Sequence, residues 1–260
     1  MSSETVRADR SPAGPQFAVL GAGSWGTALS MQLFRSGSRA VLWDIDRQHI
    51  ESMKSSGRNE KFLPEFELPE GLVLEADLET AVRQVDEILI VVPSHAFVTV
   101  LKQIAPWLKA GQGIAWACKG LEPGTGQFLH EPAQSLFGDS RPLAVVTGPS
   151  FAREVAANLP TAITVAGTEP EYCAQVARAL HGENFRAYTS EDLVGGVLGG
   201  SVEVVVAVAG GGGGGVGGGV WARAAVVGRG LGEVLRGGRG GGGGGRGLGG
   251  GGGVGGVVGA

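Results

Sequence analysis

The chain has 260 residues, enough for one large domain or two smaller ones. Its formal net charge of −4 at pH 7 lacks the basic excess of nucleic-acid-binding proteins, so we expect no nucleic-acid partner. Its two cysteines, Cys118 and Cys173, are too few for a disulfide framework and lack the spacing of metal ligands, so we expect free thiols in a reducing compartment and no metal site.

The first segment, residues 1–15, is polar and contains no apolar core. We therefore expect a disordered leader rather than a secretory signal. The rest of the chain, up to its glycine-rich tail, has no apolar run long enough to span a membrane. Together these features predict a cytoplasmic protein without a membrane span.

A glycine-rich turn stands between an expected strand and an expected helix. Residues 16–20 are the expected strand, with an apolar run at residues 17–20. Gly21, Gly23 and Gly26 follow with the spacing G-x-G-x-x-G, and residues 27–34 have a helical pattern. In this context Gly21 permits the sharp turn, Gly23 lets a pyrophosphate approach the backbone, and Gly26 allows the helix to pack closely on the strand. N–H groups at the helix N-terminus attract phosphates. The pattern predicts a dinucleotide site rather than an ordinary strand-to-helix turn.

An acidic residue follows the second expected strand, residues 40–43. Asp44 stands about 20 residues beyond the glycines, where a carboxylate usually accepts a hydrogen bond from the adenosine ribose. A carboxylate there would repel a 2′-phosphate and so favours NAD over NADP, although the nearby Arg47 weakens this inference. The alternative is that Asp44 is a solvated loop acid or a helix N-cap.

Strands and helices are expected to alternate along the remaining chain up to residue 194, apart from a proline-containing loop at residues 58–69. This alternation predicts an α/β fold, a doubly wound (Rossmann) parallel sheet over residues 16–194. The expected strands are 72–75, 87–92, 113–117, 143–146, 161–166 and 185–188, and the expected helices are 78–83, capped by Asp77, 98–108, 125–137, broken near Pro132, 153–157 and 170–180.

Several polar or aromatic residues follow the carboxyl ends of expected strands, where open α/β sheets bind ligands. Phe97 could pack on the nicotinamide or ribose of a dinucleotide, and His95 is expected to form structural hydrogen bonds. Lys119, beside a glycine, suits an anionic substrate. Gly148 and Ser150 offer a backbone and a hydroxyl donor.

Six segments, in order along residues 16–200, resemble the NAD(P)-dependent glycerol-3-phosphate dehydrogenases of bacterial type. They are VLGAGSWGTALS, RNEKFLP, VVPSHAF, KGLE, TGPSFAREVAANLPTA and SEDLVG. The resemblance implies interconversion of sn-glycerol 3-phosphate and dihydroxyacetone phosphate with NAD or NADP, in support of glycerophospholipid synthesis. It also implies a homodimer. A Rossmann dehydrogenase of the 3-hydroxy acid or 6-phosphogluconate kind is an alternative, which the segments KGLE and GPSFA disfavour.

The resemblance also assigns ligand contacts to residues of this chain. Ile45 stands where the family often has an Arg or His that aids NADPH binding, so the cofactor preference stays open. The implied dinucleotide contacts are Ser24, Trp25, Phe97, Lys119 and Ala152, and the implied substrate contacts are Lys119, Gly148 and Ser150.

The catalytic residue that the resemblance implies is missing. The family has an acid–base lysine in a G-G-A-x-K-N segment that opens an all-helical second domain, and a lysine pKa can be tuned for such a task. This chain reads GGSVEV there, with Glu203 at the lysine position. A carboxylate would repel the substrate phosphate, so no catalytic residue is intact. A catalytically inactive, dinucleotide-binding remnant is therefore an alternative function.

The final segment, residues 195–260, reads as a degenerate, glycine-rich remnant of the helical substrate domain. After Val202 only residue types with guanine-rich codons occur, yet residues 221–231 (WARAAVVGRGL) resemble the family segment N-A-R-A-A-L-I-T-R-G-L. We hypothesise that bases were misread as guanine; a genuine low-complexity tail is the alternative. As written, the tail is expected not to form the helical domain, because each glycine costs about 1 kcal/mol in a helix relative to alanine.

Overall fold

The computed structural model describes residues 16–138, 141–148, 150–193 and 195. The expected leader 1–15 and residues 196–260 of the expected remnant lie outside this part, and so does Glu203. The described elements in chain order are β1 Gln16–Leu20, α1 Ser24–Arg35, β2 Arg39–Trp43, α2 Arg47–Ser56, β3 Arg58–Asn59, β4 Leu63–Glu67, β5 Val73–Glu75, α3 Leu78–Arg83, β6 Glu87–Ile90, α4 Ser94–Ile104, the 3-10 helix η1 Ala105–Trp107, β7 Ile114–Trp116, α5 His130–Phe137, β8 Leu143–Thr147, α6 Ala152–Ala156, β9 Thr161–Gly167, α7 Pro170–Leu180 and β10 Phe185–Ser190.

An eight-stranded sheet in the order β10-β9-β8-β7-β6-β1-β2-β5 forms the centre of this structure. The chain starts at β1, winds outward through β2 to β5, and then returns to β6 on the other side of β1. This reversal between β1 and β6 is the topological switch point at which doubly wound sheets bind ligands. The predicted α/β fold class is confirmed.

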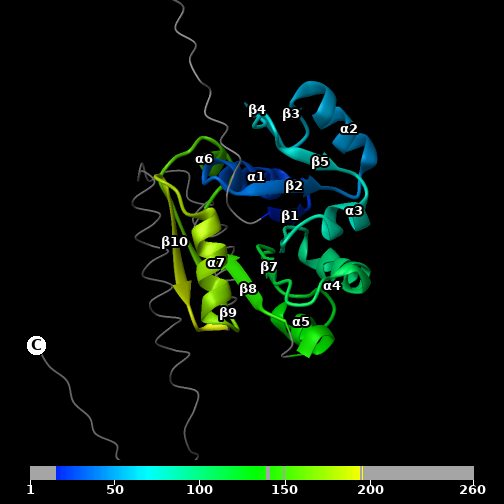
Figure 1. The fold of residues 1–260 in the computed structure, drawn as a ribbon, viewed down its shortest axis with the longest axis vertical. Helices are drawn as coiled ribbons and strands as arrows, with labels where there is room; N and C mark the ends of the chain where they lie inside the picture. The colour runs from blue at the N-terminus through cyan, green and yellow to red at the C-terminus, as the bar shows by residue number, and fades with distance from the viewer. Residues whose placement is uncertain (1–15, 139–140, 149, 194, 196–260) are drawn as a thin grey trace, which may run out of the picture.

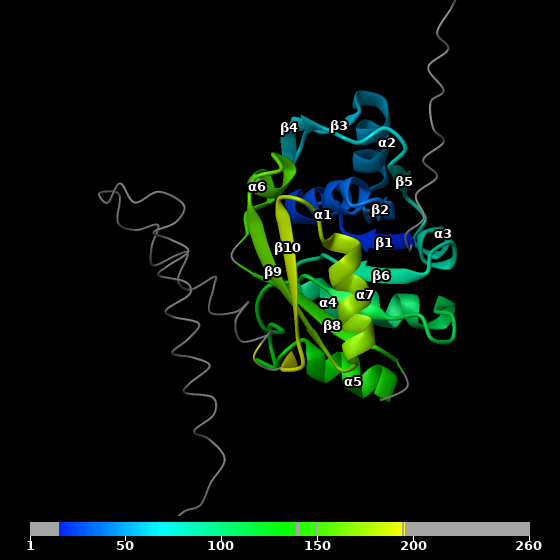
Figure 2. The ribbon, with the colours of Figure 1, turned by 60° about the vertical axis from the view of Figure 1, so that its left-hand side comes forward.

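Helices cover both faces of the sheet, as Figures 1 and 2 show. Buried residues of α1, α2 and α7 join one face of the strands in one apolar cluster, and those of α3, α4 and α5 join the opposite face in a second cluster. The central strand β1 contributes alternate residues to the two clusters, with Phe17 and Val19 on one face and Ala18 and Leu20 on the other. Burial on both faces explains why this strand reads as a continuous apolar run.

One pairing in the sheet departs from the predicted parallel arrangement, because β8 and β9 are antiparallel. The helix between them, α6, has only five residues and so rises about 7.5 Å. A strand of five residues is roughly 16 Å long, so this helix cannot carry the chain back to the start of β8. The chain therefore re-enters the sheet from the carboxyl end of β8.

The expected loop at residues 58–69 contains a small antiparallel sheet made of β3 and β4. Its pairing is short and irregular at Arg58 and Asn59, and the two strands carry no apolar alternation that would mark them in the sequence.

Three helices begin at least three residues away from their predicted start. Helix α1 begins at Ser24 instead of residue 27, directly after Gly23. Helix α4 begins at Ser94, directly after Pro93, instead of at residue 98. Helix α5 begins only at His130, and Pro132 does not break it, because the first turn of a helix has no intrahelical partner for a backbone N–H. In the described part of the chain, no helix combines the length and apolar character needed to span a bilayer.

Candidate dinucleotide and substrate site

The glycine turn after β1 has the shape that its spacing predicts. Gly21 has φ +118°, a conformation that L side chains rarely adopt, and its N–H donates to the carbonyl oxygen of Trp43 at 2.8 Å. A Cβ on Gly26 would overlap the carbonyl oxygen of Gly21. Glycine at position 26 therefore lets α1 pack closely against the turn after β1, and glycine at position 21 lets that turn lie against the backbone of Val91.

Gly23 leaves open space at the N-terminus of α1. A Cβ built on Gly23 would have no neighbour within 4 Å, and Gly23 is the N-cap of this 12-residue helix without a side-chain cap. The first N–H groups of a helix have no intrahelical partner and carry the positive end of its dipole. These features fit the pyrophosphate of a dinucleotide.

Three side chains hold the peptide groups of Ala22, in the middle of the turn. The N–H of Ala22 donates to Asp44 Oδ2 at 2.8 Å, and its carbonyl oxygen accepts from Asn59 Nδ2 at 2.8 Å. His49 Nε2 lies 3.3 Å from the same oxygen, and Asn59 Nδ2 also donates to Thr27 Oγ1 at 2.7 Å. The turn is thus tied to three elements outside it: the end of β2, helix α2 and strand β3.

No sequence pattern predicted a role for Asn59 or His49. Asn59 is completely buried and stands 37 residues from Ala22, so no local pattern joins the two. Asn59 lies in the RNEKFLP segment, which was the one feature of the sequence that could have pointed to a role for it. A buried amide needs hydrogen-bond partners, and Asn59 finds them in the glycine turn.

A cleft of about 370 Å³ opens between the glycine turn and the carboxyl ends of β6 and β7. This volume lies within the range of small-molecule sites. The cleft brings together the predicted residues Gly23, Ser24, Trp25, Gly26, Lys119, Ser150 and Ala152, and residues 91–93, Ala117, Cys118 and Phe151 complete its lining.

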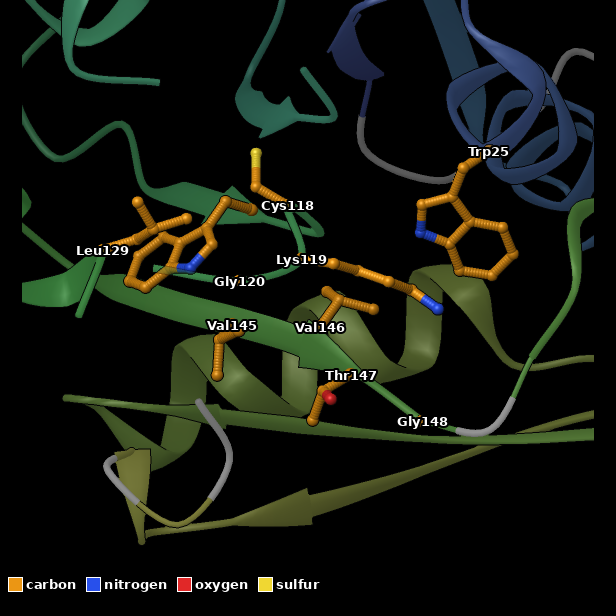
Figure 3. A pocket seen from close by; sticks show the side chains of 10 residues that line it. Trp25, Cys118, Lys119, Gly120, Leu129, Val145, Val146, Thr147 and Gly148 are labelled. Atoms are coloured by element: carbon orange, nitrogen blue, oxygen red, sulfur yellow. The ribbon is translucent and has the colours of Figure 1, made fainter. Parts of the chain in front are cut away.

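A narrower hollow of about 20 Å³ adjoins this cleft beneath Lys119 (Figure 3). The Lys119 side chain extends from the loop after β7 toward the indole of Trp25, and Gly148 lines the same hollow. Gly148 has φ +153°, and a Cβ there would lie 2.8 Å from the carbonyl oxygen of Ala162. Ser150 is buried, and its hydroxyl donates to the carbonyl oxygen of Gly148 at 3.2 Å. The predicted substrate residues therefore gather beside the glycine turn.

Cys118 lies in the wall shared by the cleft and the hollow. Burial raises the pKa of its thiol to about 12, and its Sγ lies 3.5 Å from the carbonyl oxygen of Ile90. The thiol is therefore protonated at neutral pH and unsuited to act as a nucleophile.

Phe97 does not occupy the predicted cofactor position. Its side chain is fully buried and its ring lies 5.6 Å from the ring of Trp116, at an interplanar angle of 58°. Because α4 begins at Ser94, Phe97 falls in the first turn of the helix, on the same buried face as Val100 and Leu101. The expected contact between Phe97 and a cofactor was wrong for this reason. His95, on the same turn, is exposed.

Asp44 lies at the carboxyl end of β2, and it is not the helix cap. Its Oδ1 accepts from the N–H of Asp46 at 3.0 Å, and Asp46 itself caps α2 by accepting from the N–H of His49 at 3.1 Å. Asp44 thus faces the glycine turn, whereas the neighbouring Ile45 is 83% exposed. Among the described residues, no group of three or more His, Cys, Asp or Glu side chains could hold a metal ion.

Comparisons with known proteins place this site in a family context. Residues 16–173 match the family described as NAD-dependent glycerol-3-phosphate dehydrogenase N-terminus. The glycerol-3-phosphate dehydrogenases [NAD(P)+] of Xanthomonas euvesicatoria pv. vesicatoria and Stenotrophomonas maltophilia are each 49% identical over 221 residues, which cover 85% of this chain and 65% of each relative. The chain therefore spans less than two thirds of the length of these curated relatives.

Solved structures of glycerol-3-phosphate dehydrogenases are also similar to this chain. The crystal structure of glycerol-3-phosphate dehydrogenase from Coxiella burnetii is 41% identical, has a TM-score of 0.74, and is matched over 86% of this chain and 69% of its own. The yeast glycerol-3-phosphate dehydrogenase structure, at 24% identity and a TM-score of 0.70, over 87% of this chain and 70% of its own, shares the fold.

Proposed function

The chain belongs to the family of NAD-dependent glycerol-3-phosphate dehydrogenases, and from this we propose that its protein interconverts sn-glycerol 3-phosphate and dihydroxyacetone phosphate with NAD or NADP. The reaction would supply glycerol 3-phosphate for glycerophospholipid synthesis. The observation that carries the proposal is the single cleft that joins the glycine turn to Lys119.

The residues of the cleft suit a nicotinamide dinucleotide. The open space at Gly23 and the free N–H groups at the start of α1 fit its pyrophosphate, while Ser24, Trp25 and Ala152 line the remaining path. When bound, such a cofactor supplies or accepts the hydride.

The substrate end of the cleft suits a small phosphate ester. The Lys119 ammonium group provides a positive charge beside Trp25, and the Ser150 hydroxyl and the Gly148 backbone lie next to it. In this proposal Lys119 holds the anionic substrate against the nicotinamide end of the cleft, and Gly148 and Ser150 orient it.

The acid–base group at the substrate C2 oxygen is the one part that these residues do not supply. By the family resemblance it belongs at position 203, where this sequence has Glu203. A lysine can donate a proton to the developing alkoxide without repelling the substrate phosphate, whereas a carboxylate cannot.

The proposed function is tested by the oxidation of NADH in the presence of dihydroxyacetone phosphate, with the full chain and with Glu203→Lys. Turnover that depends on dihydroxyacetone phosphate supports the proposal, and a faster rate for Glu203→Lys supports the acid–base assignment. Binding of NADH without turnover in either protein would instead favour the inactive, dinucleotide-binding alternative. Re-sequencing codons 195–260 of the gene shows whether a lysine codon stands at position 203.

The proposal extends to location and assembly. Nicotinamide dinucleotides and triose phosphates are intracellular metabolites, which supports a cytoplasmic protein, and the family resemblance supports a homodimer. Light scattering of the purified protein over a range of concentrations tests the dimer.

A further inference from the structure

Helix α6 forms part of the wall of the cleft, although it is too short to hold its own position. Phe151, its N-cap, and Ala152, its first residue, both line the cleft. The helix has five residues. A helix of this length is not stable by itself, because ordering the first turn costs more free energy than one or two hydrogen bonds supply. Its position must therefore come from contacts with other elements.

Arg35, the last residue of α1, contacts the carboxyl end of α6. Its Nη1 donates to the carbonyl oxygen of Val155 at 2.7 Å, and its Nη2 donates to the carbonyl oxygen of Ala156. The last carbonyl groups of a helix lack intrahelical partners and carry the negative end of its dipole. A guanidinium group, with a positive charge and two parallel donors, suits this position. Arg35 therefore ties α6 to α1 across 120 residues of sequence.

Apolar packing joins the same two helices. Val155 and Ala156 are buried in one cluster with Ala28 of α1. Trp25 and Ala152, which line the cleft from the starts of α1 and α6, pack against this cluster. Figures 1 and 2 both show α6 beside α1. The two helices thus move as one body as long as the contact at their carboxyl ends is kept.

Helix α1 reaches both of these parts of the cleft wall. Its start, with Ser24 and Trp25, forms the wall at the glycine turn, and Arg35 at its end holds the helix that begins at Ala152. The 12 residues of α1 rise about 18 Å, so Arg35 stands far from the start of the helix. Among the described residues that line the cleft, Arg35 does not occur.

A second residue of α1 provides an internal comparison. Gln32 Nε2 donates to the carbonyl oxygen of Leu180, the last residue of α7, at 2.9 Å. Gln32 and Arg35 thus make the same kind of contact, from one helix to the terminal carbonyl groups of another. Within the described part of the chain, however, no residue of α7 lines the cleft. Loss of the Gln32 contact should therefore affect stability and leave the cleft wall in place.

We propose that Arg35 is a positioning residue for the cofactor. It fixes α6 against α1, and this contact sets the distance between Ala152 and the glycine turn. Arg35 acts through α6 and touches neither cofactor nor substrate. The inference rests on the proposed function only in that the cleft must hold a dinucleotide.

The first measurement is amide hydrogen exchange of the full chain and of Arg35→Met, which keeps the aliphatic length and removes both donors. The N–H groups of Val155 and Ala157 donate to carbonyl oxygens one turn earlier, at 3.1 and 2.9 Å. Protection of these two N–H groups should fall roughly tenfold in Arg35→Met, because α6 opens locally. Gln32→Met removes the matched contact with α7 and should leave the protection of α6 unchanged.

The second measurement is the affinity for NADH, followed by the quenching of tryptophan fluorescence, to which Trp25 in the cleft contributes. Arg35→Met should bind NADH roughly fivefold more weakly, because the wall that carries Ala152 is no longer held in place. The fragment 5′-AMP covers only the adenosine side of the glycine turn and should bind with unchanged affinity. Gln32→Met should bind both ligands as the unaltered chain does.

Arg35→Lys separates the charge from the geometry of the two donors, and it serves as the test if Arg35→Met does not fold. The lysine keeps a positive charge near the end of α6 but lacks the planar fork that bonds two carbonyl groups at once. Its NADH affinity and its protection of α6 should therefore lie between those of Arg35→Met and the unaltered chain.

Two kinds of result would overturn the inference. If Arg35→Met leaves the protection of α6 or the affinity for NADH unchanged, Arg35 does not position the cleft wall. If NADH affinity falls equally in Gln32→Met, or if 5′-AMP affinity falls as much as NADH affinity, general destabilisation explains the effect. Failure of the proposed function is distinguishable, because the unaltered chain would then not bind NADH at all.

Discussion

The two ends of the cleft are built differently. At the glycine turn, the peptide groups of Ala22 are hydrogen-bonded on both sides by Asp44 and Asn59, and Asn59 is completely buried. At the other end, Lys119 and Gly148 lie on loops, and the hydrogen bond described there is the short-range one from Ser150 to Gly148. The dinucleotide end is held by partners distant in sequence, whereas the substrate end depends on local loop geometry.

The surroundings of the two ends differ as well. Phe151, in the cleft wall, is 53% exposed, and Leu159 and Tyr188, from the same half of the chain, are 50% and 60% exposed. The chain also spans only 65% of the length of its curated relatives. Because different residues hold the two ends of the cleft, we infer that a mutation at one end can weaken cofactor binding or substrate binding without weakening the other.

The largest effect on stability and on cofactor binding is expected from Gly26→Ala, at the glycine-turn end of the cleft. The added Cβ would overlap the carbonyl oxygen of Gly21, a backbone atom that cannot move without opening the turn. We expect a loss of about 3 kcal/mol in the free energy of unfolding, at the upper end of overpacking costs, and a loss of NADH binding. Urea denaturation and fluorescence titration measure the two quantities.

Gly23→Ala is the matched variant three residues earlier. Its Cβ would have no neighbour within 4 Å, so the free energy of unfolding should change by less than about 0.5 kcal/mol. The methyl group would nevertheless stand where a pyrophosphate must approach, so NADH affinity should fall by roughly a factor of ten or more. Unchanged affinity would show that the pyrophosphate does not pass Gly23.

Lys119→Ala changes the substrate end of the cleft and should leave the fold intact. Loss of a charge-assisted hydrogen bond costs about 1.5–3 kcal/mol, so the affinity for dihydroxyacetone phosphate should fall by about one to two orders of magnitude. Calorimetric titration in the presence of NADH measures it. Lys102→Ala removes an exposed lysine of α4 and serves as the control. Equal affinities in the two variants would remove Lys119 from the substrate site.

Asn59→Ala tests whether distant hydrogen bonds shape the turn. The substitution leaves the carbonyl group of Ala22 with the weaker contact to His49 alone, so we expect a loss of about 1–3 kcal/mol in the free energy of unfolding. NADH affinity should fall roughly fivefold, because the turn loses its orientation.

Ser38→Ala provides the comparison for Asn59→Ala. Ser38 is buried and donates to the carbonyl oxygen of Ala179 at 3.3 Å, a bond that does not involve the glycine turn. This variant should lower stability and leave NADH affinity unchanged. An equal drop in NADH affinity in both variants would mean that general destabilisation, and not the orientation of the turn, explains the effect.

The smallest effect is expected at Glu87, at the start of β6. Burial raises the pKa of its carboxyl group, against the opposing hydrogen bonds from Gln175 and from the Gly113 N–H. A raised folded-state pKa means that the protonated form is favoured on folding; this stabilisation is present below the unfolded pKa and is lost as the pH rises through the folded pKa.

Glu87→Gln keeps the neutral form at every pH and removes this loss. The free energy of unfolding of the variant minus that of the unaltered chain should therefore be larger at pH 7 than at pH 4. Urea denaturation of both proteins at the two pH values measures this difference. Glu79→Gln, on the exposed surface of α3, controls for the removal of one charge. A relative stability that falls between pH 4 and pH 7 would contradict the assigned direction of the pKa shift.

Local features of this protein were predictable from the sequence because their causes are local. The bounds of β1 and α7 agree with those expected from apolar runs and a helix-starting proline, and Asp77 caps α3 by accepting from the N–H of Thr80 at 2.8 Å. The glycine spacing predicted the turn after β1. A side chain at Gly21 or Gly26 would overlap backbone atoms of the same turn or of the neighbouring strand end.

Other features depend on how distant segments meet, and only the tertiary structure decided them. Phe97 points into the core because α4 begins at Ser94 and Trp116 lies beneath it, whereas the residue type alone was equally compatible with a cofactor contact. Asn59 reaches Ala22 across 37 residues, and β9 runs antiparallel to β8 because α6 is too short to return the chain. Local patterns determine which elements form, but contacts between distant residues determine which side chains reach the cleft.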